Sequence, residues 1–261
     1  MDKETFQNGL KTIKDGLIGK QNTSRYERPH FKIRPLDEML ANLVKIEPID
    51  WRNYAFSREP LNGKLTDEQR FEFAKDSIAC GIEYAQKIMK QYGSKNPVLI
   101  AQKMGMNVTY PDYPEKTDRV LFGEFKEPNN IMIYMDAVKK ATKSLNEPGV
   151  KEILTSHLNV SNLLLAHELF HNVEDKYRKE IYTRTKKIRL WNIGPLHNDS
   201  EIYTLGEIAG MAFAQEMCGL TYSPFVMDVF LVYGYSPEEA SGLYEEIMER
   251  AGLKDKLNNE N

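Results

Sequence analysis

Residues 160–174 read VSNLLLAHELFHNVE, and this stretch determines how the rest of the chain is interpreted. It is apolar almost all round a 3.6-residue period, which is typical of a buried helix, and Asn159 or Ser161 can cap its first turn. Two histidines and a glutamate inside such a helix are costly to bury unless a partner satisfies them. A divalent cation would do so directly, so the stretch predicts a metal-binding helix.

The spacing of the polar residues favours the same interpretation. His167 and His171 are four residues apart, so a helix places both imidazoles on one face, where they can bind a single metal ion. Glu168 lies about 100° round the helix from His167 and can reach a water on that ion without being a ligand. The pattern therefore predicts a zinc site with Glu168 as general base.

A catalytic zinc needs a third protein ligand and one open position. Downstream, Glu207 lies in a predicted helix rich in Gly and Ala, where an unpaired carboxylate is costly, and it is the favoured third ligand. Glu201 and His197 stay open as alternatives, Glu201 also being explained as an acid in the first turn of that helix. Asp199 or Ser200 is expected to cap the helix.

Further site residues are suggested by position alone. Tyr203 lies four residues before Glu207, so it is the first choice for a donor that stabilises the oxyanion, followed by His197, Tyr177 and Tyr182. Packing with an exposed hydroxyl is the competing explanation for Tyr203. Glu174 shares the histidine face and can orient an imidazole, although a surface acid near neighbouring basic residues is the more favoured interpretation.

Composition excludes several classes of protein. The 261 residues comprise 41% apolar and 28% charged residues, which is ordinary globular usage, and 35 Lys and Arg balance 38 Asp and Glu. The resulting net charge of −3 lacks the basic excess that binding to phosphates requires, so no nucleic-acid partner is expected. The segment 176–189, KYRKEIYTRTKKIR, is a basic exception that could favour an acidic substrate segment, but a solvated loop is the commoner explanation.

The compartment is inferred from what the sequence lacks. No apolar run reaches the length of about 18 residues that a spanning helix needs, and residues 1–20 have no apolar centre of a signal peptide. Cys80 and Cys218 are far apart and form no CxxC pair, so neither a disulfide framework nor a thiolate zinc site is expected. These features predict a cytoplasmic protein without a membrane partner, and they leave the oligomeric state open.

Local signals predict mainly helices with a small sheet. Thr66 with Gln69 is a capping box, and Gly93 ends the helix that follows, whose apolar positions are expected to be Phe71, Ala74, Ile78, Ile82, Ala85 and Met89. Short β-branched and aromatic runs separated by prolines predict about three strands, expected to be antiparallel. The expected helices are 4–18, 36–44, 66–92 and 97–105, the strands are 106–110, 120–125 and 131–135, and the chain is expected to be helical from there to its end.

This order of elements predicts an α+β fold with the sheet on one side of a helical body. Residues 1–65 are expected to form an N-terminal extension of unknown role, residues 66–257 the main domain, and residues 258–261 a disordered tail. Ser236 followed by Pro237 marks the start of a late helix.

The sequence resembles the ImmA/IrrE-type zinc metallopeptidases, which are gluzincin-like proteins. The resemblance rests on the motif HELFH at 167–171, on EIAGMAFA at 207–214, which is similar to the family's E-x-x-A-N-x-F-A, and on NPVLIAQKMG at 96–105 followed by strands. Gly210-Met211 stands where the family usually has Ala-Asn, and no helix-turn-helix module is found. The resemblance implies a zincin-like domain that holds Zn²⁺ through His167, His171 and Glu207.

The predicted function is therefore a zinc-dependent metallopeptidase that hydrolyses a peptide bond in an intracellular protein, with a regulatory protein as the expected kind of substrate, as for bacterial or phage-type regulatory proteases. Its substrate could add a strand to an edge of the small sheet. Two other classes remain open: a non-catalytic metallopeptidase-like domain that binds a partner or senses a signal, and a small-amide or deformylase-like hydrolase with the same motif.

Overall fold

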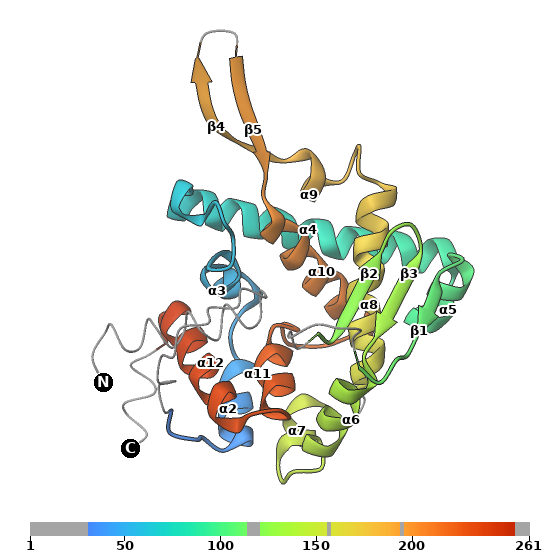
Figure 1. Cartoon of the computed structure of the whole chain (residues 1–261), viewed down its shortest axis with the longest axis vertical. Coiled ribbons are helices and arrows are strands. Elements are labelled where there is room, and N and C mark those ends of the chain that lie inside the picture. The colour runs from blue at the N-terminus through green and yellow to red at the C-terminus, as the bar shows by residue number, and fades with distance from the viewer. Residues whose placement is uncertain (1–30, 114–120, 156–157, 194–195, 254–261) are drawn as a thin grey trace.

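The computed structural model describes residues 31–113, 121–155, 158–193 and 196–253, and it is mainly helical with a three-stranded sheet and a separate two-stranded sheet (Figure 1). The α+β class is confirmed at this level. The helix predicted at 4–18 and the tail at 258–261 lie outside the described residues. The helices are α2 (Leu36–Leu43), α3 (Arg52–Phe56), α4 (Asp67–Tyr92), α5 (Pro97–Lys103), α6 (Met135–Ser144), α7 (Val150–Leu154), α8 (Val160–Lys176), α9 (Tyr182–Thr185), α10 (Tyr203–Cys218), α11 (Val226–Tyr233) and α12 (Pro237–Arg250), with 3₁₀ turns at Pro48–Trp51 and Asn62–Lys64.

Side-chain caps mark the starts of several helices, as predicted. The Thr66 hydroxyl accepts from the Gln69 backbone N–H at 3.2 Å, and the Gln69 side chain accepts from the Thr66 N–H at 2.9 Å, which completes the capping box of α4. Ser236 caps α12 in the same manner through the Glu239 N–H. These contacts are local in sequence, which is why the helix starts could be predicted.

The buried face of α4 differs from the expected one. Phe71 is 40% exposed, and its ring lies under the Arg52 guanidinium at 5.6 Å. Ala74 and Ala85 are buried as expected, but Ile78, Ile82 and Met89 are only partly buried. The buried residues of α4, whose main contact is with α10, are Phe73, Ala74, Ser77, Cys80, Gly81, Tyr84, Ala85 and Ile88. Helical spacing alone fits both stripes, and contact with α10 selects the one whose small residues allow close approach.

The three-stranded sheet is mixed, so the prediction of an antiparallel sheet was wrong. Its order is β1 (Asn107–Thr109), β3 (Asn130–Ile133), β2 (Gly123–Lys126). β2 pairs antiparallel with β3 in a hairpin, but β1 pairs parallel with β3, with Val108 opposite Ile131. Because β3 lies between β1 and β2, the two outer strands are not paired with each other, and β2 forms one edge of the sheet.

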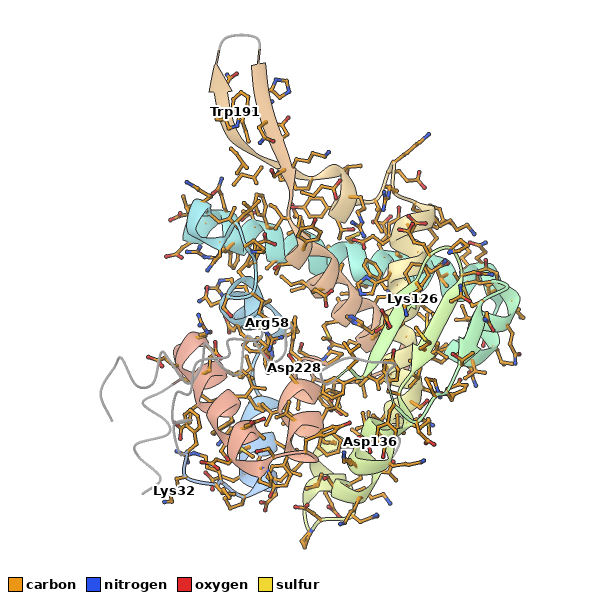
Figure 2. All side chains as sticks on the ribbon, in the orientation of Figure 1. Lys32, Arg58, Lys126, Asp136, Trp191 and Asp228 are labelled. Carbon is orange, nitrogen blue, oxygen red and sulfur yellow. The ribbon has the colours of Figure 1, made fainter. Side chains whose placement is uncertain are left out.

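A second correction concerns residues 187–201, where the expected helix is a hairpin of β4 (Lys187–Ile193) and β5 (Leu196–Glu201). The hairpin projects from the body of the molecule and carries the exposed Trp191 (Figure 2). Asp199 and Ser200 therefore lie in β5, and Ile202 precedes the first turn of α10 without a side-chain cap. The Gly194-Pro195 pair in the sequence is the turn signal that predicts such a hairpin.

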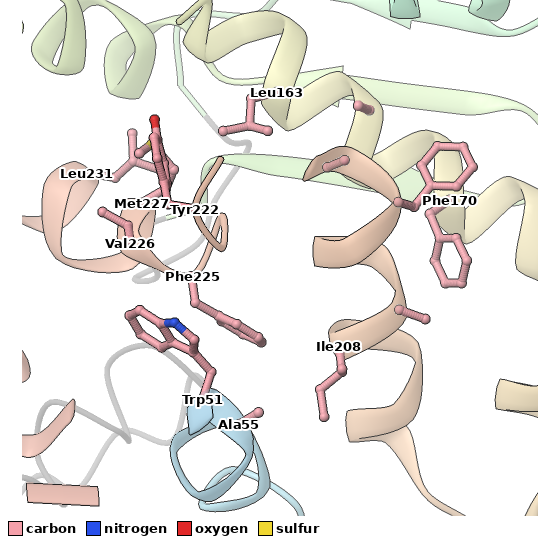
Figure 3. Packing of buried hydrophobic residues seen from close by; sticks show 14 of the residues in the cluster. Trp51, Ala55, Leu163, Phe170, Ile208, Tyr222, Phe225, Val226, Met227 and Leu231 are labelled. Carbon is pink, nitrogen blue, oxygen red and sulfur yellow. The ribbon is translucent and has the colours of Figure 1, made fainter. Parts of the chain in front are cut away.

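One hydrophobic core joins the described N-terminal segment to the rest of the chain. Trp51 stacks on Phe225 with ring centroids 5.6 Å apart (Figure 3). Tyr54 meets the same Phe225 ring edge-on at 5.9 Å. Residues 31–65 thus share their core with α11 and α12 and form no core of their own. Both Cys80 and Cys218 are free, as expected. Within the described ranges, no helix has the length and apolarity needed to cross a membrane.

Candidate metal centre

The histidines of the HELFH motif lie on the face of α8 that packs against α10. The Asn159 side chain caps α8 by accepting from the Asn162 backbone N–H at 2.9 Å, and most other positions of α8 are buried apolar residues. The regular helix places the Nε2 atoms of His167 and His171 3.2 Å apart. Two facing imidazole nitrogens at this distance cannot both carry a proton, so a shared cation would satisfy both lone pairs.

Helix α10 brings Glu207 to the same point. Its carboxylate oxygens lie 3.5 Å from His167 Nε2 and 3.7 Å from His171 Nε2. Gly210, one turn later, makes this approach possible, because a Cβ there would lie 3.0 Å from the His167 ring carbon Cε1 and 3.1 Å from Nδ1. Gly210 is thus the residue that leaves space for the imidazole.

The donor atoms of His167, His171 and Glu207 all lie within 4.8 Å of one another. A tetrahedral zinc site with bonds of about 2.0–2.1 Å has its donors about 3.3 Å apart. The two histidine nitrogens are 3.2 Å apart, and they lie 3.5 and 3.7 Å from different oxygens of the Glu207 carboxylate. With one donor atom from each residue the group is slightly wider than a zinc site, so the side chains would have to move closer together around an ion. Two imidazoles and one carboxylate are also a donor set that zinc accepts. The residues therefore fit a zinc ion.

The electrostatics of the group follow from its tight packing. Burial alone would lower the pKa of His171, but Glu174 and the carboxylates of Glu207 and Glu168 outweigh it and raise that pKa to about 9. Desolvation between the two helices would raise the pKa of Glu207, but only in part because its side chain is 54% exposed, and His167 and the charge of His171 lower this pKa to about 2. Glu207 is therefore an anion at neutral pH, as a metal ligand must be.

Glu168 lies between α8 and β2, and the backbone N–H of Phe125 donates to its carboxylate. Glu168 is buried, with 8% of its surface exposed. Burial raises the pKa of Glu168 above its ordinary value, and the negative charge of Glu207 adds to this, although both histidines oppose it. A carboxylate with a raised pKa beside a metal site is suited to accept a proton and give it back.

Glu174 is a buried residue, so its interpretation as a surface acid was wrong. It is 2% exposed, its Oε2 lies 3.6 Å from His171 Nδ1, and the same oxygen accepts from Arg184 Nη2 at 2.8 Å. Arg184 belongs to the basic segment 176–189, which on this side points into the protein rather than into solvent. The chain Arg184–Glu174–His171 holds the imidazole from the side opposite the metal position.

The alternative third ligands lie away from the donor group. Glu201 is in β5 with its carboxylate 3.6 Å from Arg184 and 3.8 Å from Lys187, and His197 on the hairpin contacts Asp199 at 3.5 Å. Neither joins the group formed by His167, His171 and Glu207 among the described residues. The structure therefore places only the favoured candidate, Glu207, beside the histidines.

The tyrosines suggested as oxyanion donors lie in different places, and one of them is next to the candidate metal centre. Tyr203 is the first residue of α10, is 70% exposed and borders the same cavity as Glu207. Tyr177 packs its ring against Tyr84 at 5.2 Å, and the pKa of Tyr182 is raised by burial and by Asp76 on α4. Of the tyrosines proposed from the sequence, Tyr203 alone lines the cavity beside the site within the described residues.

Sequence reasoning missed an ion pair in the wall of that cavity. Arg58, which follows α3, places Nη1 3.0 Å from the Asp228 carboxylate of α11 (Figure 2), and the Tyr54 hydroxyl donates to the same carboxylate at 2.7 Å. The signal was present, because Asp228 is the single acid in the apolar helix VMDVFLVY. An acid in such a helix indicates a cation brought from elsewhere.

Comparisons of this chain with models of protein families, with curated proteins and with solved structures found no match. Function is therefore inferred from the residues themselves. The strongest features are the convergence of His167, His171 and Glu207, and the buried carboxylate of Glu168 beside them.

Proposed function

We propose that this chain is a zinc-dependent metallopeptidase with a zincin-like domain of the ImmA/IrrE type, which cleaves a peptide bond in a cytoplasmic, regulatory protein. The observation that carries the proposal is the approach of His167, His171 and Glu207 to within 4.8 Å, with Glu168 one residue from the first ligand. Two free cysteines agree with a reducing compartment.

His167, His171 and Glu207 would hold the zinc. When bound there, the ion supplies a water of lowered pKa and polarises the peptide carbonyl. Glu168 accepts the proton of the attacking water and delivers it to the leaving amine, a task for which its raised pKa is suitable. The Tyr203 hydroxyl, at the border of the same cavity, is proposed to donate to the oxyanion.

The substrate is proposed to bind as an extra strand along β2. This strand is at the edge of the sheet, so one side of its backbone is not paired with β3. β2 also packs on α8 next to Glu168. A peptide aligned on this edge would pass the metal position with its scissile carbonyl held by main-chain hydrogen bonds.

The variant Glu168→Gln tests this function. It is expected to keep one zinc per chain and to lose cleavage by about 10²–10⁴-fold, because the general base is removed while the ligands remain. The probes are a casein substrate and a peptide mixture from a digested cell extract, with new termini read by mass spectrometry. Asp175→Asn, seven residues later on the same helix, is the matched control and is expected to cleave like the parent.

The two alternative functions predict different results in this experiment. A non-catalytic binding or sensor domain predicts that parent and Glu168→Gln behave alike on every substrate. A small-amide hydrolase predicts cleavage of N-acylated amino acids and none of protein or peptide. Either outcome would contradict the peptidase proposal.

A further inference from the structure

A cavity of about 480 Å³ lies beside the candidate metal centre. This volume is within the range of sites that hold small ligands or peptide side chains. One wall carries His167, Glu168 and Glu207, and the cavity extends from there between α8, α10 and α11. Any group that fills it must therefore lie directly next to the reacting bond.

Most of the remaining wall is apolar. It is formed by side chains from six parts of the chain that the fold brings together, among them Phe122, Leu163, Met211, Phe225, Met227 and Leu231. Figure 3 shows Leu163 of α8 on one side, with Met227 and Leu231 of α11 on the other. Water finds few hydrogen-bond partners on such a surface, whereas a large apolar side chain that enters the cavity would gain free energy by burying its apolar area.

Arg58 and Asp228 form a charged pair in this wall. The Arg58 guanidinium is held by Asp228 at 3.0 Å and lies over the Tyr54 ring, 4.3 Å from the centroid. Arg58 and Glu207 line the same cavity. A guanidinium carries five N–H donors, and one Asp228 oxygen and the Tyr54 hydroxyl use only part of them.

The cavity is continuous with the proposed peptide path. Gly123, the first residue of the edge strand β2, lines it together with Glu168. A peptide that leaves the β2 edge at Gly123 would direct its next side chain into the apolar space and bring its backbone carbonyl to the Arg58 side. An oxygen there would meet a fixed cation in a mostly apolar surrounding, where a charge-assisted hydrogen bond is strong.

We infer that this cavity is the specificity pocket of the enzyme: it accepts a large apolar residue next to the scissile bond, and Arg58 binds the carboxyl-side oxygen of that residue. This deepens the proposed function and rests on it. The oxygen could belong to a backbone carbonyl or to a terminal carboxylate, so the experiment includes both. The inference also gives the N-terminal segment a role, because Ala55 and Arg58 both come from it.

Binding can be measured without zinc and without cleavage. In protein labelled at the methionine methyl groups, Met211 and Met227 report the cavity by NMR, and Met39 in α2, which is fully buried elsewhere, is the internal control. N-acetylphenylalaninamide is expected to shift the signals of Met211 and Met227 with at least about tenfold higher affinity than N-acetylglycinamide, because only the former buries a ring. Equal affinities, or shifts spread over all methionines, would overturn the inference.

The role of Arg58 is tested with the same probes. Arg58→Met is expected to weaken binding of N-acetylphenylalaninamide about tenfold, and Arg58→Lys is expected to restore part of it. Free N-acetylphenylalanine binding more tightly than its amide would assign the site to a terminal carboxylate, and the reverse would assign it to a backbone carbonyl. Unchanged affinity of both probes in Arg58→Met would exclude Arg58 from the site.

Cleavage then tests selectivity. In the peptide mixture, sites are expected to carry Leu, Phe or Met at one position beside the cut, and Met211→Trp, which fills the pocket, is expected to shift them to Gly or Ala. Leu99→Trp, at a 47% exposed position of α5, is the matched control. If nothing is cleaved but the NMR preference holds, the peptidase proposal fails and the pocket stands; cleavage without any apolar preference overturns the pocket alone.

Discussion

Glu174 contacts a candidate metal ligand and is expected to affect zinc affinity. Its carboxylate contacts His171 Nδ1 at 3.6 Å and Arg184 at 2.8 Å, and a carboxylate behind a ligand imidazole fixes the ring and raises its basicity. Glu174→Gln is therefore expected to lower zinc affinity by about 10–100-fold while the protein stays folded. A competition titration against a chelating dye measures this, with Asp175→Asn as control, whose carboxylate contacts Arg178 at 3.4 Å. Equal affinities of the two variants would contradict the role of Glu174.

The pKa of His171 predicts how zinc binding depends on pH. Without metal this pKa is raised from 6.5 to about 9, so its ion pairs stabilise the fold fully below pH 6.5 and are lost as the pH rises toward 9. Zinc must displace that proton, so zinc affinity is expected to rise between pH 6.5 and 9, by up to about tenfold per pH unit for one proton released. Calorimetry in two buffers of different ionisation enthalpy measures the affinity and the proton release. A flat profile above pH 6.5 would contradict the prediction.

Between elements, the close approach of α8 and α10 depends on a missing side chain at Gly210. In a free helix, Gly→Ala would gain about 1 kcal/mol of propensity. Here the new Cβ would lie 3.0 Å from the His167 ring, so the ring would have to shift by a few tenths of an ångström relative to Glu207 and His171. Gly210→Ala is expected to lower zinc affinity by about tenfold or more. Gly63→Ala, where a Cβ meets nothing within 4 Å, is the control, and equal zinc affinity in both would refute the packing argument.

For the whole molecule, the metal would link helices that are far apart in sequence, because two ligands come from α8 and one from α10. Zinc at 100 times its dissociation constant stabilises a fold by about 2.7 kcal/mol. For a chain of this size, removal by a chelator is expected to lower the unfolding midpoint by about 5–10 °C. Glu168→Gln is expected to show the same shift and Glu207→Ala almost none. A shift of equal size in Glu207→Ala would place the ion elsewhere.

Part of the fold and of the candidate site could be predicted from local sequence patterns. The capping box at Thr66 and Gln69, the cap at Ser236 and the i, i+4 spacing of His167 and His171 are relations within one or two helical turns, so a sequence determines them by itself. The choice of Glu207 over its alternatives was correct for a different reason than the expected one: its side chain is 54% exposed, so its nearness to the two histidines, and not the cost of burial, singles it out.

Tertiary packing decided the rest. It turned Glu174 inward, paired β1 parallel to β3 and brought Arg58 to the cavity beside the histidines. It also selected the face of α4 that meets α10. Each of these contacts joins different elements, and no periodic pattern in the sequence marks it. The contacts depend on which surfaces of the helices and strands fit together. The candidate metal ligands could be predicted from the sequence, whereas the groups that contact them and line the cavity beside them were determined only by tertiary packing.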